Sequence, residues 1–104
     1  RLRVLNLSNN CLQSLPASAA ENHPLETLLL TANLLSDLTP LSLFHNLRIL
    51  HAAYNTLQVL PDSCVSAWQE MEELVLSGNQ LCQLPENMTR LAHLRVLRIH
   101  SNLL

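Results

Sequence analysis

The chain has 104 residues, of which 48% are hydrophobic, 13% charged and 3% aromatic. This composition excludes a disordered polar segment, and the net charge of −2 argues against nucleic acid or an anionic membrane surface as the main partner. The apolar runs are only a few residues long, so no transmembrane segment is predicted. The chain is therefore expected to fold around a leucine-filled core.

Five asparagines recur along the chain at intervals of 22 to 24 residues. Each closes the same frame, in which apolar residues, mostly leucine, stand eight, five and three positions before the asparagine and two positions after it. The asparagines are Asn10, Asn33, Asn55, Asn79 and Asn102. The frame divides the chain into repeats 2–24, 25–46, 47–70 and 71–93 and a partial repeat 94–104.

The centre of each frame alternates apolar with variable residues, which is typical of a short strand. In the first frame Leu5 and Leu7 are predicted to face the core, while Val4, Asn6 and Ser8 face outward. The same alternation predicts four further outward triplets: Thr27-Leu29-Thr31, Ile49-His51-Ala53, Glu73-Val75-Ser77 and Val96-Arg98-His100.

The segments that follow the asparagines return the chain to the start of the next strand. Prolines that are expected to end pairing follow the last inward leucine at Pro16, Pro61 and Pro85. The second repeat is shorter and carries Pro40 later, so its outer segment is expected to be irregular. In the third repeat Asp62 is predicted to cap a short helix that buries Val65, Trp68 and Met71.

This repeat length and frame resemble the leucine-rich repeat family from one end of the chain to the other. The resemblance implies an α/β repeat solenoid, an arc with a parallel β-sheet on its concave face and short helices, 3-10 turns or loops on its convex face. Neither end carries a polar capping repeat, so we expect residues 1–104 to be an excerpt of a longer array whose flanking repeats cover the two ends.

Two sets of equivalent residues are predicted to support the fold. Asparagine offers an acceptor and two donors on a short arm, so Asn33, Asn55 and Asn79 are expected to be buried and fully hydrogen-bonded in the turns. The position after the first leucine of each frame alternates in charge: Arg3, Glu26, Arg48, Glu72 and Arg95. This row is expected to fix the register of the repeats, and a role in holding a partner is the alternative.

The outward strand positions form the one continuous surface that folding does not require. The candidate partner-binding residues on this concave face are Asn6, Leu29, Ile49, His51, Tyr54, Glu73, Val75, Arg98 and His100. Apolar residues on a wall that faces water often mark protein contact, although strand propensity alone also favours Ile and Val there. We therefore predict a protein or peptide site on this face.

The sequence offers no catalytic, metal or cofactor site in this segment. His51 and His100 lie two strands apart, roughly 10 Å, too far to share a metal without a third ligand. The other histidines, His23, His45 and His93, are expected at the edge of the core. A single glycine cannot form a phosphate-binding loop. The odd cysteine count and the scattered positions of Cys11, Cys64 and Cys82 favour free thiols and a cytoplasmic protein over an extracellular one.

Three stretches are similar to the later repeats of PH domain leucine-rich repeat protein phosphatases: LRILHAAYNTLQVLP at 47–61, EELVLSGNQLCQLP at 72–85 and IHSN at 99–102. In that family the repeats lie between a pleckstrin-homology domain and a PP2C-type phosphatase domain, which acts on kinases. The resemblance implies that a divalent metal belongs only to the phosphatase domain, that kinases are candidate partners, and that membrane or nuclear association comes from other domains.

The sequence thus predicts a protein-binding scaffold, the substrate- or partner-docking segment of an intracellular signalling Ser/Thr phosphatase. A segment of an extracellular leucine-rich repeat receptor or matrix protein that recognises a ligand is the alternative. A purely architectural spacer is a third interpretation.

Overall fold

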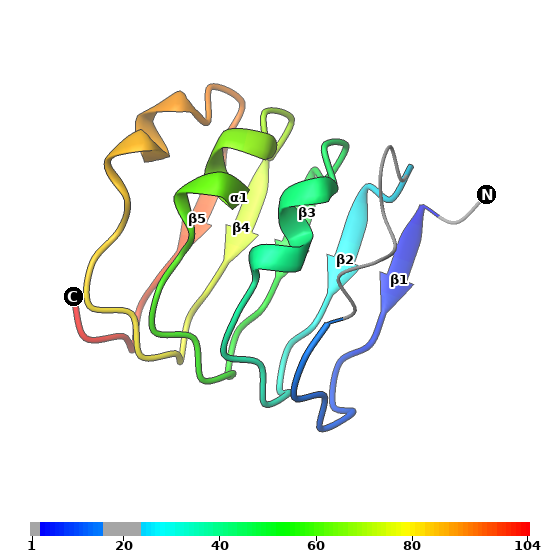
Figure 1. Ribbon diagram of the computed structural model, residues 1–104, viewed down its shortest axis with the longest axis vertical. Coiled ribbons are helices and arrows are strands. Elements are labelled where there is room, and N and C mark those ends of the chain that lie inside the picture. Colours follow the sequence, from blue (N-terminus) through cyan, green and yellow to red (C-terminus); the bar gives the residue numbers. More distant parts are fainter. Residues whose placement is uncertain (1–2, 16–23) are drawn as a thin grey trace.

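The computed structural model describes residues 3–15 and 24–104 (Figure 1). Five short strands form one open parallel sheet in chain order. They are β1 (Val4–Asn6), β2 (Thr27–Leu29), β3 (Ile49–His51), β4 (Glu73–Val75) and β5 (Val96–Arg98). Each strand pairs with the next at frame-equivalent residues, so that Leu28, Leu50 and Leu74 lie side by side. The predicted strands and their register are confirmed.

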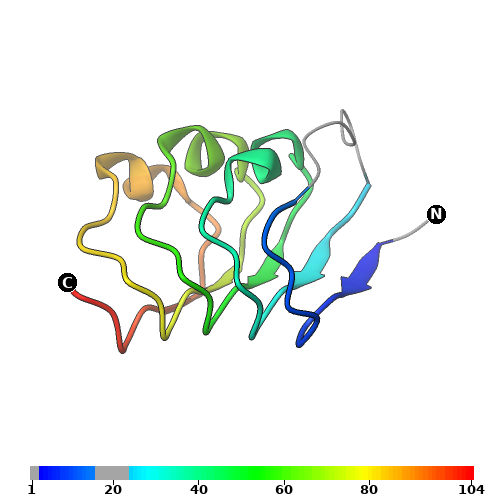
Figure 2. The same ribbon diagram turned by 60° about the horizontal axis from the view of Figure 1, so that its bottom comes forward.

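Where the structure describes a whole repeat, the chain makes one coil, with the strand on one face and the return segment on the opposite face (Figure 2). Three return segments carry a short helix: η1 (Thr39–Leu43, 3-10), α1 (Asp62–Ala67) and η2 (Glu86–Arg90, 3-10). Helix α1 packs between the two 3-10 helices. The predicted α/β solenoid, with the sheet on one face and short helices on the other, is therefore confirmed; the segment around Pro16 lies outside the described residues.

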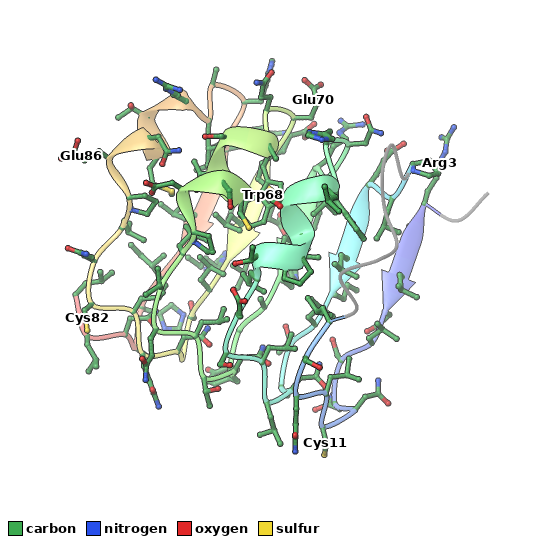
Figure 3. The ribbon with its side chains drawn as sticks, viewed as in Figure 1. Arg3, Cys11, Trp68, Glu70, Cys82 and Glu86 are labelled. Carbon is green, nitrogen blue, oxygen red and sulfur yellow. The ribbon has the colours of Figure 1, made fainter. Side chains whose placement is uncertain are left out.

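The core lies between the sheet and the helices of the middle coils. Leu50 and Leu74 are fully buried, whereas Leu97 at the equivalent position of β5 is 39% exposed because no further strand covers it. Trp68 is also fully buried, and its indole Nε1–H donates to the carbonyl of Leu41 in the preceding coil at 3.1 Å (Figure 3). The tryptophan therefore ties neighbouring coils together beneath the helices, as its predicted packing role requires.

The prediction that Asp62 caps the helix of the third repeat is wrong. Pro61, in an extended conformation, is the N-cap residue, and Asp62 already lies in the first helical turn and makes no capping hydrogen bond. The helix also ends at Ala67, where the amide of Trp68 donates to the Cys64 carbonyl at 3.0 Å. A proline fits the N-cap because its fixed φ suits the extended backbone there.

The second repeat is more regular than predicted. Its outer segment forms the 3-10 helix η1 rather than an irregular loop. The Asp37 carboxylate organises its start, since Oδ1 accepts from the amide of Thr39 at 2.9 Å and from its hydroxyl at 2.6 Å. Pro40 then occupies the first turn, where a missing amide hydrogen costs nothing. A turn that is one residue shorter is therefore closed by side-chain bonding rather than left open.

Candidate protein-binding surface

The asparagine column holds the coils together and leaves the concave face free for other uses. Asn33, Asn55 and Asn79 are only 4–6% exposed, as predicted. The Asn79 side-chain Oδ1 accepts from the amides of Asn55 and Leu57, each at 3.1 Å. Its Nδ2 donates to the carbonyls of Leu76 at 2.8 Å and Ala52 at 3.1 Å, in its own coil and the preceding one. The end members are less buried: Asn10 and Asn102.

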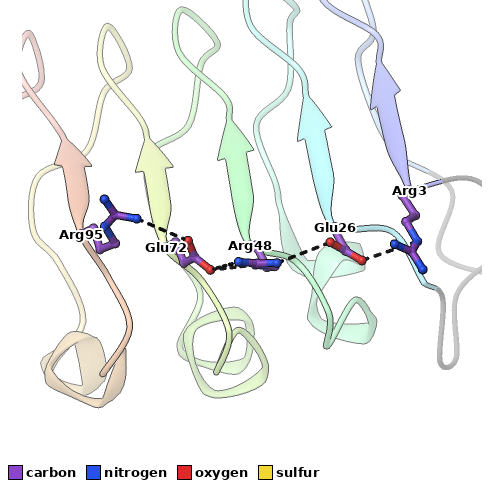
Figure 4. Close-up of polar contacts among 5 residues, drawn as sticks. All are labelled: Arg3, Glu26, Arg48, Glu72 and Arg95. Carbon is purple, nitrogen blue, oxygen red and sulfur yellow. Dashed lines mark hydrogen bonds and ion pairs between the residues drawn. The ribbon is translucent and has the colours of Figure 1, made fainter.

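A row of alternating charge runs just before the strands (Figure 4). Arg48 lies between two acids, with nitrogen–oxygen distances of 3.7 Å to Glu26 and 2.5 Å to Glu72. The hydrogen bond from Arg48 to Glu72 raises the pKa of this arginine above its ordinary value. At the two ends of the row, a guanidinium nitrogen of Arg3 lies 3.7 Å from a Glu26 carboxylate oxygen, and one of Arg95 lies 4.0 Å from a Glu72 carboxylate oxygen. The arginine side chains are at least half exposed and the acids about one-third, so water and salt screen each ion pair strongly. The row exists as predicted, and its role in register stays a prediction.

The sheet register brings the candidate binding residues onto one wall. The first row across the strands is Val4, Thr27, Ile49, Glu73 and Val96, and the second is Asn6, Leu29, His51, Val75 and Arg98. The predicted third row begins with Ser8 and ends with the exposed His100, but its middle members Ala53 and Ser77 are buried. At these positions the chain has left the strands and enters the turns, where the Tyr54 amide donates to the Ser77 carbonyl at 2.8 Å.

The apolar residues of the wall are less open than predicted. Leu29, Ile49, Val75 and Val96 are all half-buried. Parallel strands stand about 4.8 Å apart, so side chains in one row shield each other from water. Val4 on the first strand lacks such a neighbour on one side and is 56% exposed. The apolar contribution of the wall is therefore a shallow lining rather than a large exposed patch.

His51 and Glu73 contact each other on the wall, with Nε2 of the imidazole against Oε2 of the carboxylate. The register aligns Glu73 with Ile49, so the contact runs diagonally from β4 to the far end of β3. Both side chains remain about one-third exposed. The sequence placed both residues on this wall but did not reveal their contact; a diagonal offset of two positions in a parallel register is the signal that could have found it.

Tyr54 occupies a left-handed turn position that recurs just before each asparagine of the column. The φ values there are 61° at Asn9, 61° at Ala32, 55° at Tyr54, 71° at Gly78 and 60° at Ser101. The tyrosine is 59% exposed, and its ring lies against Gly78 of the next coil, where an added Cβ would come within 2.4 Å of ring carbon Cδ1. Only glycine leaves room for the ring there, a pairing that the sequence did not reveal.

The cysteines and the remaining histidines add no reactive site. Cys64 is buried, donates to the Leu38 carbonyl at 3.0 Å, and has its pKa raised to about 12 by burial; the other two thiols are exposed, and all three are free as predicted. The expectation that His45 and His93 lie at the core edge is wrong, because both are exposed on loops beyond the helices; His23 is outside the described residues.

Within residues 3–15 and 24–104, no three histidine, cysteine or acidic side chains gather closely enough to hold a metal ion. In the same part of the chain, no helix has the length and hydrophobicity needed to cross a bilayer.

Comparison with known proteins agrees with this architecture. Residues 45–104 match a family model described as leucine rich repeat, and residues 1–22 match a second model of the same description. The Protein phosphatase PHLPP-like protein of Drosophila melanogaster is 50% identical over 107 residues, which cover 100% of this chain and 11% of the relative. The human PH domain leucine-rich repeat-containing protein phosphatase 1 is 42% identical over 106 residues, which cover 97% of this chain and 6% of the relative.

A rice relative, the Plant intracellular Ras-group-related LRR protein 8, is 34% identical over 100 residues, covering 92% of this chain and 26% of the relative. The chain spans only about a tenth or less of the length of the two phosphatase relatives. On the evidence of the repeat frame, the sheet and these matches, the chain belongs to the leucine-rich repeat family and is similar along its whole length to the repeat region of PH domain leucine-rich repeat protein phosphatases.

Proposed function

We propose that this segment is a protein-binding scaffold that docks substrates or partners for an intracellular signalling Ser/Thr protein phosphatase. The observation that supports this most is that the residues that stabilise the coils and the exposed candidate binding residues are two separate sets. Buried asparagines and leucines hold the coils together, whereas Tyr54, Arg98 and His100 are exposed and serve no packing role in the core. The similarity to proteins named phosphatases supplies the enzymatic context.

Catalysis in this proposal belongs to a different part of the protein. A PP2C-type domain with its own divalent metal would hydrolyse the phosphoester, and the segment described above would need no cofactor. Kinases are the proposed docked partners, and the cytoplasm is the proposed setting, which the free thiols support. Docking would act by raising the local concentration of a bound protein near the catalytic domain.

A comparison of two substrates in the full-length protein tests this role. Tyr54→Ala removes an exposed ring from the concave side, and Val59→Ala, at a 65% exposed side chain on a return loop, is the matched control. We expect Tyr54→Ala to raise KM for a phosphorylated protein substrate about fivefold, corresponding to ~1 kcal/mol of lost contact. Hydrolysis of p-nitrophenyl phosphate, which is too small to dock, should not change.

Two results would contradict the proposal. Equal kinetics of Tyr54→Ala, Val59→Ala and the unsubstituted protein toward several protein substrates would favour a mere spacer. Absence of phosphatase activity in the full-length protein would remove the enzymatic context altogether and leave the extracellular alternative open.

A further inference from the structure

The arginines on and beside the strands differ in whether an acidic side chain pairs with them. Arg3, Arg48 and Arg95 each pair with an acid of the charge row. In contrast, within the described residues no carboxylate lies within ion-pairing distance of Arg98 or His100. The imidazole Nδ1 of His100 lies 3.3 Å from the neighbouring Ser101 hydroxyl.

The acid on this wall is already engaged. Glu73 is the acidic residue among the described outward positions of the strands, and its carboxylate contacts the His51 ring. Strand β5 and the residues just after it therefore present a guanidinium and an imidazole that no carboxylate of residues 3–15 and 24–104 engages. Arg98 ends β5 and His100 lies two residues beyond it, so the alternation of side chains places both on the outward side, roughly 7 Å apart along the chain.

An aromatic surface adjoins these two side chains. The ring of Tyr54 lies over Gly78, and the Gly78 amide donates to the His100 carbonyl at 3.1 Å. Val75 is the register partner of Arg98 and provides a half-buried apolar neighbour. The strand register, the close approach of Tyr54 to Gly78 and the bond from Gly78 to His100 link these residues, and we call them the β5 patch: Tyr54, Val75, Gly78, Arg98 and His100.

We propose that the β5 patch binds an acidic, extended segment of a protein partner. This inference deepens the proposed docking function and rests on it. An exposed guanidinium binds a carboxylate through two parallel hydrogen bonds, and a neighbouring imidazole can donate a third. The tyrosine ring and Val75 then cover an apolar side chain next to the acidic one. Residues two positions apart in an extended segment lie on the same face, so an acidic residue and an apolar residue at positions i and i+2 reach the patch together.

A peptide titration on the full-length protein tests this charge preference. The probe is a fluorescein-labelled peptide in which every second residue is alternately glutamate or leucine, with serine between them, so that glutamates and leucines share one face. Copies of this peptide carry glutamine or lysine in place of glutamate. We expect anisotropy to show the tightest binding for the glutamate peptide, weakening as salt screens the charges. Arg98→Glu should reduce that affinity at least tenfold, and His100→Ala about threefold.

Two controls carry the same chemical changes elsewhere. Arg90→Glu alters an exposed arginine of η2 on the opposite face, and His93→Ala alters an exposed histidine on a loop beyond the helices. Both should bind the glutamate peptide like the unsubstituted protein. Because all four side chains are exposed, the variants should keep the urea midpoint, which shows that any loss of binding is not a loss of folding.

The outcomes separate this inference from the docking proposal. Binding of the lysine or glutamine peptide as tight as the glutamate peptide, or unchanged affinity in Arg98→Glu, would overturn the acidic preference. If Tyr54→Ala still raised KM for a protein substrate in that case, the docking proposal would stand alone. If neither substitution changed any binding or kinetic constant, both proposals would fail.

Discussion

Replacing Asn79 with alanine should be among the most damaging single substitutions in this chain, although the residue touches no ligand. Its Oδ1 is the acceptor for two buried amides, those of Asn55 and Leu57. Within the described residues neither amide has a second acceptor, so both would be left unsatisfied in Asn79→Ala. An unsatisfied buried donor costs about 1–3 kcal/mol, which gives about 2–6 kcal/mol for the pair.

The carbonyl groups that accept from the Asn79 side chain lose much less stabilising free energy in Asn79→Ala. Nδ2 of Asn79 donates to the carbonyls of Ala52, Leu76 and Ser77. Each of these carbonyls keeps another donor: Asn55 Nδ2, Asn102 Nδ2 and the Tyr54 amide respectively. The two amides therefore dominate the loss, which is comparable to the net stability of a small domain.

Urea unfolding followed by circular dichroism measures this effect. Asn10→Ala is the control, because its side chain is exposed and water can replace its hydrogen bonds to the Leu7 and Ser8 carbonyls. We expect a large drop in the urea midpoint for Asn79→Ala and a change below about 1 kcal/mol for Asn10→Ala. Equal destabilisation by the two substitutions would refute the reasoning that unsatisfied amides hold the coils together.

Three further outcomes follow from the structure. Gly78→Ala should cost more than about 2 kcal/mol in urea unfolding, since its Cβ would meet the Tyr54 ring at 2.4 Å and its φ is 71°. Glu72→Gln should lower the urea midpoint only slightly, and the loss should shrink in 1 M salt, because it breaks solvent-screened ion pairs with two arginines. A thiol reagent at pH 8 should label two cysteines of the native protein, with Cys64 protected by burial and by a pKa of about 12.

Each of these outcomes has a control. The double variant Tyr54→Ala, Gly78→Ala should recover part of the stability, and no recovery would mean that the ring does not cause the clash. Loss of stability in Glu72→Gln that is insensitive to salt would point to packing rather than charge. Unfolding should make the third thiol, that of Cys64, available to the reagent. Because the pKa of Cys64 is raised in the folded state, the free energy of unfolding should also fall as the pH rises above about 9, where the thiol of the unfolded chain ionises.

The sequence predicted most of the fold because each residue type that the fold requires recurs at the equivalent position of every repeat. The recurrence of asparagine and of the inward leucines fixed both the strands and their register, from Leu28 to Leu74. Periodicity identifies equivalent residues, but it does not tell how far a side chain reaches. The diagonal contact of His51 with Glu73 and the burial of Ser77 depend on that reach, and the N-cap at Pro61 depends on one local backbone angle.

At Tyr54, the effect of a substitution on folding stability can be separated most clearly from its effect on binding. A left-handed φ of 55° costs a side-chain-bearing residue roughly 1–2 kcal/mol. The 41% of the tyrosine that is covered corresponds to about 80 Å2, or at most about 2 kcal/mol of burial. These contributions nearly cancel, so Tyr54→Gly should change the free energy of unfolding by no more than about 1.5 kcal/mol, far less than Asn79→Ala.

The same substitution should nevertheless weaken binding of the glutamate–leucine peptide severalfold, because it removes the aromatic part of the β5 patch. The urea midpoint and the peptide anisotropy, measured on one preparation, therefore distinguish a binding residue from a folding residue. A large loss of stability with unchanged peptide affinity would place Tyr54 in the framework of the coils. It would leave Arg98 and His100 without the neighbour on which the proposed recognition of an apolar side chain depends.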